Sequence, residues 1–271
     1  MSASKSSQFQ FVKEKGWKRG LGNLLSGEYS AWFQSSRWWK HLLIWFGSVN
    51  VMMAIMVIAS VGEAKKGNEG PPLLLMYGIF GGMFVAFGVM IIMQQVLTRE
   101  KSSGTAAWVL SKPVTRTAFV VSRLVVNSIA ILLTAVIVPG VIVYFTLGLF
   151  SDLGWLSPFG FTAALVMTSL NMFFWITLVL MMGTLSDSSS VVIAVPIALF
   201  LAFAYGPGLV PQLIYISPLM LSFSPTGQIN PLAISFINGG PVFSWLPLIS
   251  TVVSCVAFVV IAIWRFNRQE F

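Results

Sequence analysis

Charged residues are scarce in this sequence. Only 9% of its 271 residues are charged, whereas 56% are hydrophobic, and the mean hydropathy is +0.86. A water-soluble protein needs far more polar side chains to cover its surface. Lipid must therefore be the solvent for much of the chain.

Cysteine and histidine are almost absent as well. The one cysteine, Cys255, excludes an intrachain disulfide, and the one histidine is His41. The sequence has no H-E-x-x-H, no G-x-S-x-G and no G-x-x-x-x-G-K-[ST] pattern, so we expect no catalytic residue and no cofactor or metal bound by this chain. Thirteen methionines suggest copper, but no cysteine or histidine accompanies them at ligand spacing, and methionine is common packing material.

Ionisable residues are also scarce within the apolar runs. Arg123 lies near one end of such a run, and Asp187 lies in a turn between two of them. Proton-coupled transport and a hydrophilic channel lack their usual residues. An apolar path fits lipid-like or amphipathic cargo better than a small ion.

Six apolar runs approach the ~20 residues that cross a bilayer. They cover residues 42–61, 73–97, 119–145, 158–183, 191–205 and 246–264. The fifth is short and contains Pro196. The sequence thus predicts an all-α membrane protein with six transmembrane helices in residues 42–271. Residues 1–41 are polar and basic and have no apolar core of a signal peptide.

The positive charge is distributed unevenly around these runs. Fourteen of the 16 Lys and Arg residues flank one side, and only Lys65 and Lys66 fall on the other. This bias places both termini of a multi-pass protein in the cytoplasm. Topology and anionic membrane lipids explain the net charge of +8, so no nucleic-acid partner is expected.

Residues 21–33 have apolar side chains at helical spacing on one face, which predicts an amphipathic helix that is too polar to span. We expect it to lie along the inner leaflet and turn sharply into the first span; the alternative is a soluble helix docked on another subunit. Aromatic and basic residues there are typical of a headgroup anchor: Trp32, Arg37, Trp38, Trp39 and Lys40. Residues 1–20 are predicted to be a loose tail.

The loop at residues 98–118 is the largest basic loop. Ser103 or Thr105 can cap a short helix through residues 106–110, which Pro113 stops. The apolar cluster of Trp108, Val109 and Leu110 is predicted to dock into another protein. The alternative is that it dips back into the membrane interface.

Between residues 207 and 245 the chain has no charge but many prolines and glycines. An uncharged but broken backbone predicts short helices that re-enter the outer leaflet beside other helices. A plain apolar cap on the outer side is the alternative. Within the spans, Gly78 and Gly82 permit close helix approach, inside the subunit or across a dimer, and Pro139 and Pro196 are candidate kinks.

The loop and the topology together resemble the permease subunits of type 2 ABC exporters. The sequence resemblance lies in Arg99-Glu100, Gly104-Thr105, Leu110-Ser111, Pro113, Thr115-Arg116, Phe119 and Arg123. It implies a separate ATPase subunit that carries ATP and magnesium, and a second permease chain, either identical or different. It also implies an ATPase-coupling interface formed by Glu100, Gly104, Thr105, Trp108, Val109, Leu110 and Arg116. Glu100 has the alternative of pairing with Arg99 or Arg116.

The expected function is therefore that of a non-catalytic permease subunit in the cell membrane, driven by a partner ATPase to export a hydrophobic or amphipathic substrate. The alternative is a membrane interaction subunit that passes ATPase-driven motion to an extracytoplasmic partner without moving cargo.

Overall fold

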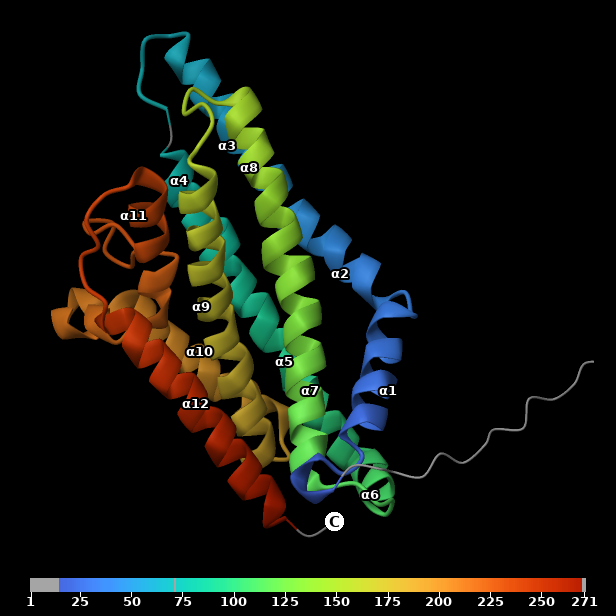
Figure 1. The fold of residues 1–271 in the computed structure, drawn as a ribbon. Helices are drawn as coiled ribbons and strands as arrows, with labels where there is room; N and C mark the ends of the chain where they lie inside the picture. Colours follow the sequence, from blue (N-terminus) through green and yellow to red (C-terminus); the bar gives the residue numbers. More distant parts are fainter. Residues whose placement is uncertain (1–14, 71, 270–271) are drawn as a thin grey trace, which may run out of the picture.

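The computed structural model describes residues 15–70 and 72–269, and all regular secondary structure in those residues is helical. Six helices are long and apolar enough to cross a membrane (Figure 1). They are Arg37–Ala64, Leu73–Ser102, Arg116–Phe150, Pro158–Leu185, Ser189–Gly208 and Leu246–Asn267. Each predicted run falls inside one of them, so the all-α, six-span prediction is confirmed.

The first three spans are each made of two α-helices joined by a π-helical stretch. They consist of α2 (Arg37–Trp45), η2 (Phe46–Val51) and α3 (Met52–Ala64); α4 (Leu73–Tyr77), η3 (Gly78–Phe84) and α5 (Val85–Ser102); and α7 (Arg116–Ile131), η4 (Leu132–Ile137) and α8 (Val138–Phe150). The other three spans contain α9 (Pro158–Leu185), α10 (Ser189–Tyr205) and α12 (Leu246–Asn267).

Pro139 lies two residues after the end of the π-helical stretch η4. Proline lacks the N–H that an α-helix needs at that position, and a wider π turn is one way in which a helix adjusts to this loss. Pro196, in contrast, lies inside α10 without interrupting it. Whether either proline is a flex point stays a prediction.

The helix α9 is at the centre of the bundle, with α5, α10, α11 and α12 packed around it (Figure 1). More than half of its most apolar stretch is buried, 56% against 22% for α12. The fully buried Trp175 of α9 lies 5.4 Å from the ring of Phe200 on α10, and Phe200 lies 4.2 Å from Phe87 on α5. These aromatic contacts make α5, α9 and α10 one packed unit.

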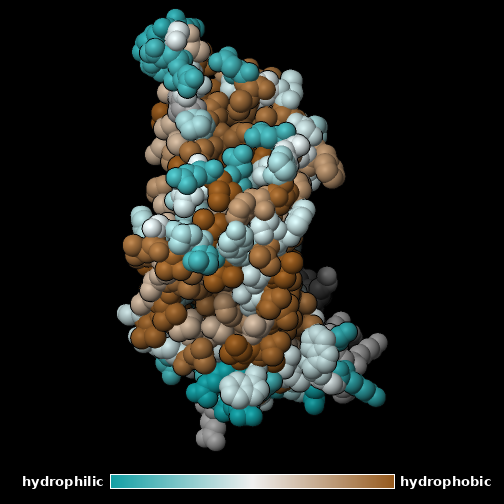
Figure 2. Space-filling view, turned by 90° about the vertical axis from the view of Figure 1, so that its left-hand side faces the viewer, coloured by the Kyte–Doolittle hydropathy of each residue, from teal (hydrophilic) through white to brown (hydrophobic). Residues whose placement is uncertain are grey.

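The chain between α10 and α12 forms only short helices, which are η5 (Gly206–Gly208), η6 (Pro211–Tyr215), η7 (Pro218–Leu221) and α11 (Leu232–Asn238). Figure 1 shows that α10 and α12 reach only part of the height of α8 and α9, and that this segment lies above them beside α9. On this face, Figure 2 shows a hydrophobic belt below a zone of mixed hydropathy, with hydrophilic groups at both ends of the molecule. Re-entry of the segment into the membrane stays a prediction.

Residues 21–33 form the helix α1 (Leu21–Phe33), as predicted. It runs beside α7 in the same direction, because later residues of this segment contact later residues around α7. Trp17 contacts Thr115, Glu28 contacts Arg123, and Trp32 contacts Asn127. Whether it lies along the inner leaflet and turns sharply into the first span stays a prediction. Thr115 donates hydrogen bonds to the carbonyl oxygens of Trp17 and Arg19, so this part of the predicted tail is not loose. Residues 1–14 of the predicted tail lie outside the described residues.

Candidate functional site

The helix α6 (Thr105–Leu110) lies at one end of the bundle, between the end of α5 and the start of α7. Because Lys101, Lys112, Arg116 and Arg265 also lie at this end, we call it the basic end (bottom of Figure 1). The described ends of the chain lie here too. This end contains nearly all of the residues predicted to couple the chain to an ATPase.

A buried arginine joins three helices near the basic end. Arg123 of α7, whose side chain is 6% exposed, forms an ion pair from Nη1 to Glu28 Oε1 of α1 at 2.8 Å. Its Nη2 pairs with Glu100 Oε1 of α5 at 2.8 Å, and its Nε donates to both carboxylate oxygens of Glu100 at 3.0 Å. A buried guanidinium needs such charge-assisted bonds to offset its loss of water.

Glu100 therefore has an internal partner, and that partner is neither Arg99 nor Arg116. The alternative that it pairs with one of those two residues is wrong for this structure. The side chain of Glu100 remains 20% exposed.

The carboxyl group of Glu28 lies in a mixed environment. Burial raises its pKa above the ordinary value, and the charge of Arg123 opposes this effect. Glu28 was not among the predicted site residues. It is the one acidic residue of an amphipathic helix, and that is the signal in the sequence from which its role could have been inferred.

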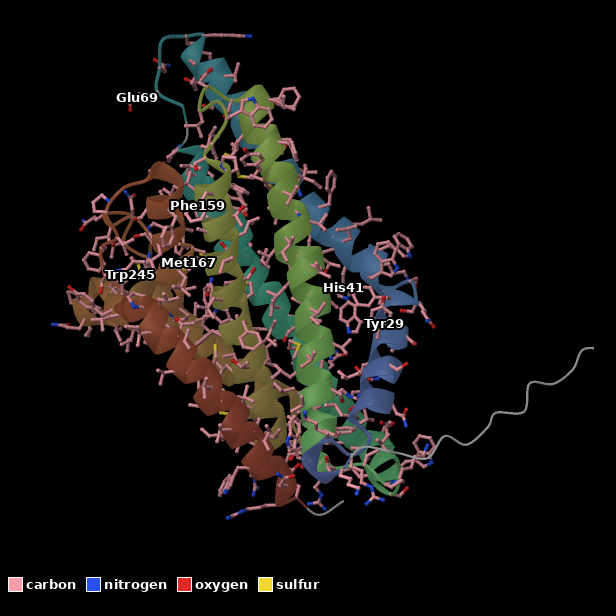
Figure 3. The ribbon with its side chains drawn as sticks, in the orientation of Figure 1. Tyr29, His41, Glu69, Phe159, Met167 and Trp245 are labelled. Carbon is pink, nitrogen blue, oxygen red and sulfur yellow. The ribbon has the colours of Figure 1, made fainter. Side chains whose placement is uncertain are left out.

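A second polar contact joins α1 to α7 one turn further on. The indole Nε1 of Trp32 donates to Asn127 Oδ1 at 2.8 Å, and the ring packs 5.1 Å from that of His41 on α2. Figure 3 shows Tyr29 on α1 and His41 on the neighbouring helix α2. Trp32 is only 4% exposed and bonds within the chain, and the anchor role predicted for it stays a prediction. Arg37, Trp38, Trp39 and Lys40 are all exposed at the start of the first span, where an anchor role stays a prediction.

The helix α6 begins after Gly104, whose φ of 72° lies in the left-handed region that favours glycine. Gly104 is also the N-cap, so the expected side-chain cap is wrong; the hydroxyls of Ser103 and Thr105 lie 2.8 Å from one another instead. Proline at 113 follows the helix, as predicted.

The apolar residues of α6 do not form one exposed cluster. Ala106 is fully buried and fixes the helix to the bundle, and Val109 and Leu110 are partly buried against the core. Trp108 is 63% exposed, and the Lys112 ammonium lies 3.5 Å from the centre of its ring. Of the three predicted docking residues, Trp108 is the most exposed.

The residues on either side of α6 hold the ends of two other spans. Lys101 Nζ donates to the carbonyl oxygen of Gly183 on α9 at 3.1 Å and pairs with Asp187 Oδ1 at 2.6 Å. Arg116 Nη1 donates to the carbonyl oxygen of Asn267 on α12 at 2.7 Å. Cations stabilise the C-terminal ends of helices, where carbonyl groups lack partners. Arg116 thus binds within the chain.

A cavity of about 580 Å³ opens between α1, α2, α5, α6 and α7. Its lining includes Glu28, Arg37, His41, Arg99, Glu100 and Arg123. We call it the arginine cavity. Sequence patterns did not indicate it, because its residues come from five helices.

Gly78 and Gly82 lie against the segment that precedes the last span. A Cβ atom at Gly78 would lie 2.6 Å from the Ser222 carbonyl oxygen, and one at Gly82 would lie 2.6 Å from Ser222 Oγ. The same hydroxyl accepts a hydrogen bond from Asn171 Nδ2 at 2.8 Å. The close approach predicted for these glycines is therefore present inside the subunit.

Comparisons with known proteins are consistent with this arrangement. Residues 21–271 match the model of a family described as ABC-2 family transporter protein. A search of curated proteins gives no significant match. The family match covers all six spans, α1 and α6, so this multi-pass membrane protein belongs to the ABC-2 transporter family.

Proposed function

We propose that this chain is the permease subunit of an ATP-driven exporter of hydrophobic or amphipathic molecules. Membership of the ABC-2 family supports a permease subunit that works with an ATPase. In the proposal, ATP and magnesium bind the ATPase, the basic end faces the cytoplasm of a cell whose plasma membrane holds the spans, and a second permease chain, identical or different, completes the transporter.

The observation that carries the proposal is the contrast between Trp108 and the rest of α6. Its ring is exposed, while Ala106 on the same helix is fully buried. An exposed aromatic side chain on a fixed helix is the kind of group that anchors a protein interface. We infer that Trp108 inserts into the ATPase subunit.

The contacts of Lys101 and Arg116 support a route by which movement of the ATPase reaches the spans. Both residues flank α6, and each holds the end of a different span. When the ATPase closes, displacement of α6 pulls on the ends of α9 and α12 as well as on α5 and α7. Because α9 is the central helix, a small shift of its end changes the packing of most of the bundle.

The experiment compares two exposed tryptophans, each of which has a lysine ammonium near its ring. Trp108→Glu should abolish co-purification with the co-expressed ATPase subunit. Trp17→Glu is the matched control, because Trp17 is also exposed at the basic end and has the ammonium of Lys18 5.4 Å from its ring centre. We expect the control to retain the ATPase. Equal binding by both variants would refute the docking role of Trp108.

Transport itself is tested in vesicles that contain both subunits and a fluorescent amphiphile. ATP-dependent efflux is expected from the wild type, and Trp108→Glu should reduce it to background. Stimulated ATP hydrolysis without movement of any amphiphile tested would contradict the proposed export.

A further inference from the structure

The arginine cavity contains more positive charge than its carboxylates neutralise. Its lining includes three arginines and two glutamates. Arg123 binds both glutamates, and its Nε and Nη2 engage both oxygens of Glu100. Among the described residues, the side chains of Arg37 and Arg99 have no ion pair or hydrogen bond, although Arg37 lies near enough to Glu28 for its charge to oppose the rise in the pKa of that carboxyl. Two cations in one cavity therefore remain available to an external anion.

One wall of the cavity is apolar at one end and basic at the other. Ile91, Gln95 and Arg99 are spaced four residues apart on α5, so they lie above one another on one face of the helix. Along this face the lining changes from an aliphatic side chain, to an amide, to a guanidinium. Ile91 is 54% exposed, which leaves this end of the wall open to an apolar chain.

Arg37 lies where the first span begins, beside the exposed Trp38 and Trp39. Aromatic and basic residues at the start of a span are typical of the level of lipid headgroups. The cavity thus combines two unpaired arginines with an aliphatic wall at the expected boundary of the membrane. An inorganic anion would use only the first feature.

We propose that the arginine cavity binds the phosphate-bearing headgroup of an anionic amphiphile, with Arg37 and Arg99 as the cationic ligands and Ile91 against the apolar chain. Arginine suits this role because its planar group donates several hydrogen bonds to phosphate oxygens. Arg123 positions the cavity walls by holding α1, α5 and α7 together. This inference goes beyond the proposed function, and its test needs no ATPase subunit.

The test measures binding of a fluorescent phosphatidylglycerol to the purified chain in non-ionic micelles, with a fluorescent phosphatidylcholine in parallel. The wild type should bind the anionic lipid at least about tenfold more tightly. Arg37→Gln combined with Arg99→Gln should weaken that binding by about 25-fold, since each basic residue near an anionic headgroup contributes about fivefold. Arg99→Gln alone changes an exposed side chain and should weaken it by about fivefold.

The matched control combines Lys40→Gln with Arg265→Gln. It removes the same charge from exposed residues that do not line the cavity. We expect its affinity to stay within about twofold of the wild type. An equal loss in the control and cavity variants would overturn the proposal, because attraction to general surface charge would then explain the binding. Equal affinity of the wild type for the two lipids would also overturn it.

A further arm separates a lipid from a free anion. Ile91→Trp leaves the charge unchanged but fills the apolar wall, so it should weaken lipid binding, and millimolar inorganic phosphate should not displace the lipid. Full affinity in Ile91→Trp together with displacement by phosphate would overturn the assignment to an amphiphile in favour of a free phosphate.

Discussion

The ammonium of Lys101 lies 3.1 Å from the carbonyl oxygen of Gly183, and this contact joins the end of α5 to the end of α9. The side chain of Lys101 is 8% exposed, whereas that of its other partner, Asp187, is 85% exposed. The two bonds of Lys101 therefore contribute differently to stability. The bond to the backbone carbonyl is shielded from water, and the ion pair with Asp187 is not.

Lys101→Met should destabilise the protein by about 1.5–3 kcal/mol, because it removes a charge-assisted bond to a shielded carbonyl. Asp187→Asn should change little, since exposed ion pairs contribute at most about 1 kcal/mol. The comparison requires only thermal unfolding midpoints of both variants in detergent. Equal midpoint shifts in the two variants would contradict the ranking.

Arg123→Met should be the most damaging single change at the basic end. It leaves the carboxylates of Glu28 and Glu100 in place without their cation, and breaking a buried pair in this way costs about 3–5 kcal/mol. Arg123→Lys should recover only part of the loss, because a lysine cannot bind both carboxylates through a planar fork. Chemical unfolding of the three proteins measures the effect, and a full recovery by lysine would argue against the fork geometry.

The stability of the protein should depend on pH through Glu28. Burial raises the pKa of this carboxyl above its ordinary value of 4.5, against the opposing charges of Arg123 and Arg37 and with a further contribution from Glu100. The folded chain thus binds the proton more tightly than the unfolded chain does. This contribution is fully present below pH 4.5 and is lost as the pH rises through the raised pKa.

Glu28→Gln should remove that loss, because the amide resembles the protonated carboxyl group. Its unfolding midpoint should fall less than that of the wild type as the pH is raised from 4.5 toward neutrality. A steeper fall in the variant would mean that the ionised carboxylate stabilises the fold.

Gly78→Ala should destabilise the protein by about 1–3 kcal/mol, because the new Cβ atom would lie 2.6 Å from the backbone oxygen of Ser222. Gly62→Ala is the matched control. Gly62 is also helical, and a Cβ atom there meets nothing within 4 Å, so the change should be neutral or stabilising by up to about 1 kcal/mol. Thermal unfolding midpoints of the two variants test the contact. A loss of stability of similar size in both would show that contact with Ser222 is not the cause.

Hydropathy was sufficient to place all six spans, because a run of apolar residues is a local property of the sequence. The bounds of α1 agree with the predicted helix for the same reason, since the spacing of its apolar residues fixes its period. The position of α6 also follows from local signals, with Gly104 before it and Pro113 after it.

The contacts between helices could not be predicted in this way. Trp32 and Asn127 are 95 residues apart, and Arg116 and Asn267 are 151 apart. To predict these pairs one must know which helices are neighbours, and the periodicity of the sequence does not give that information. One signal was available: an arginine inside a predicted span needs a carboxylate partner, and the chain has only eight acidic residues.

The absence of charge between Ser188 and Trp264 has a consequence for biosynthesis. The last two spans leave the ribosome after the others, and the sequence that connects them carries no charge to fix their direction of insertion. At the basic end, the end of α9 is held by Lys101 and the end of α12 by Arg116, and both of these residues are synthesised earlier. We therefore expect the first half of the chain to help orient the second half, together with Arg265 and Arg268 after the last span.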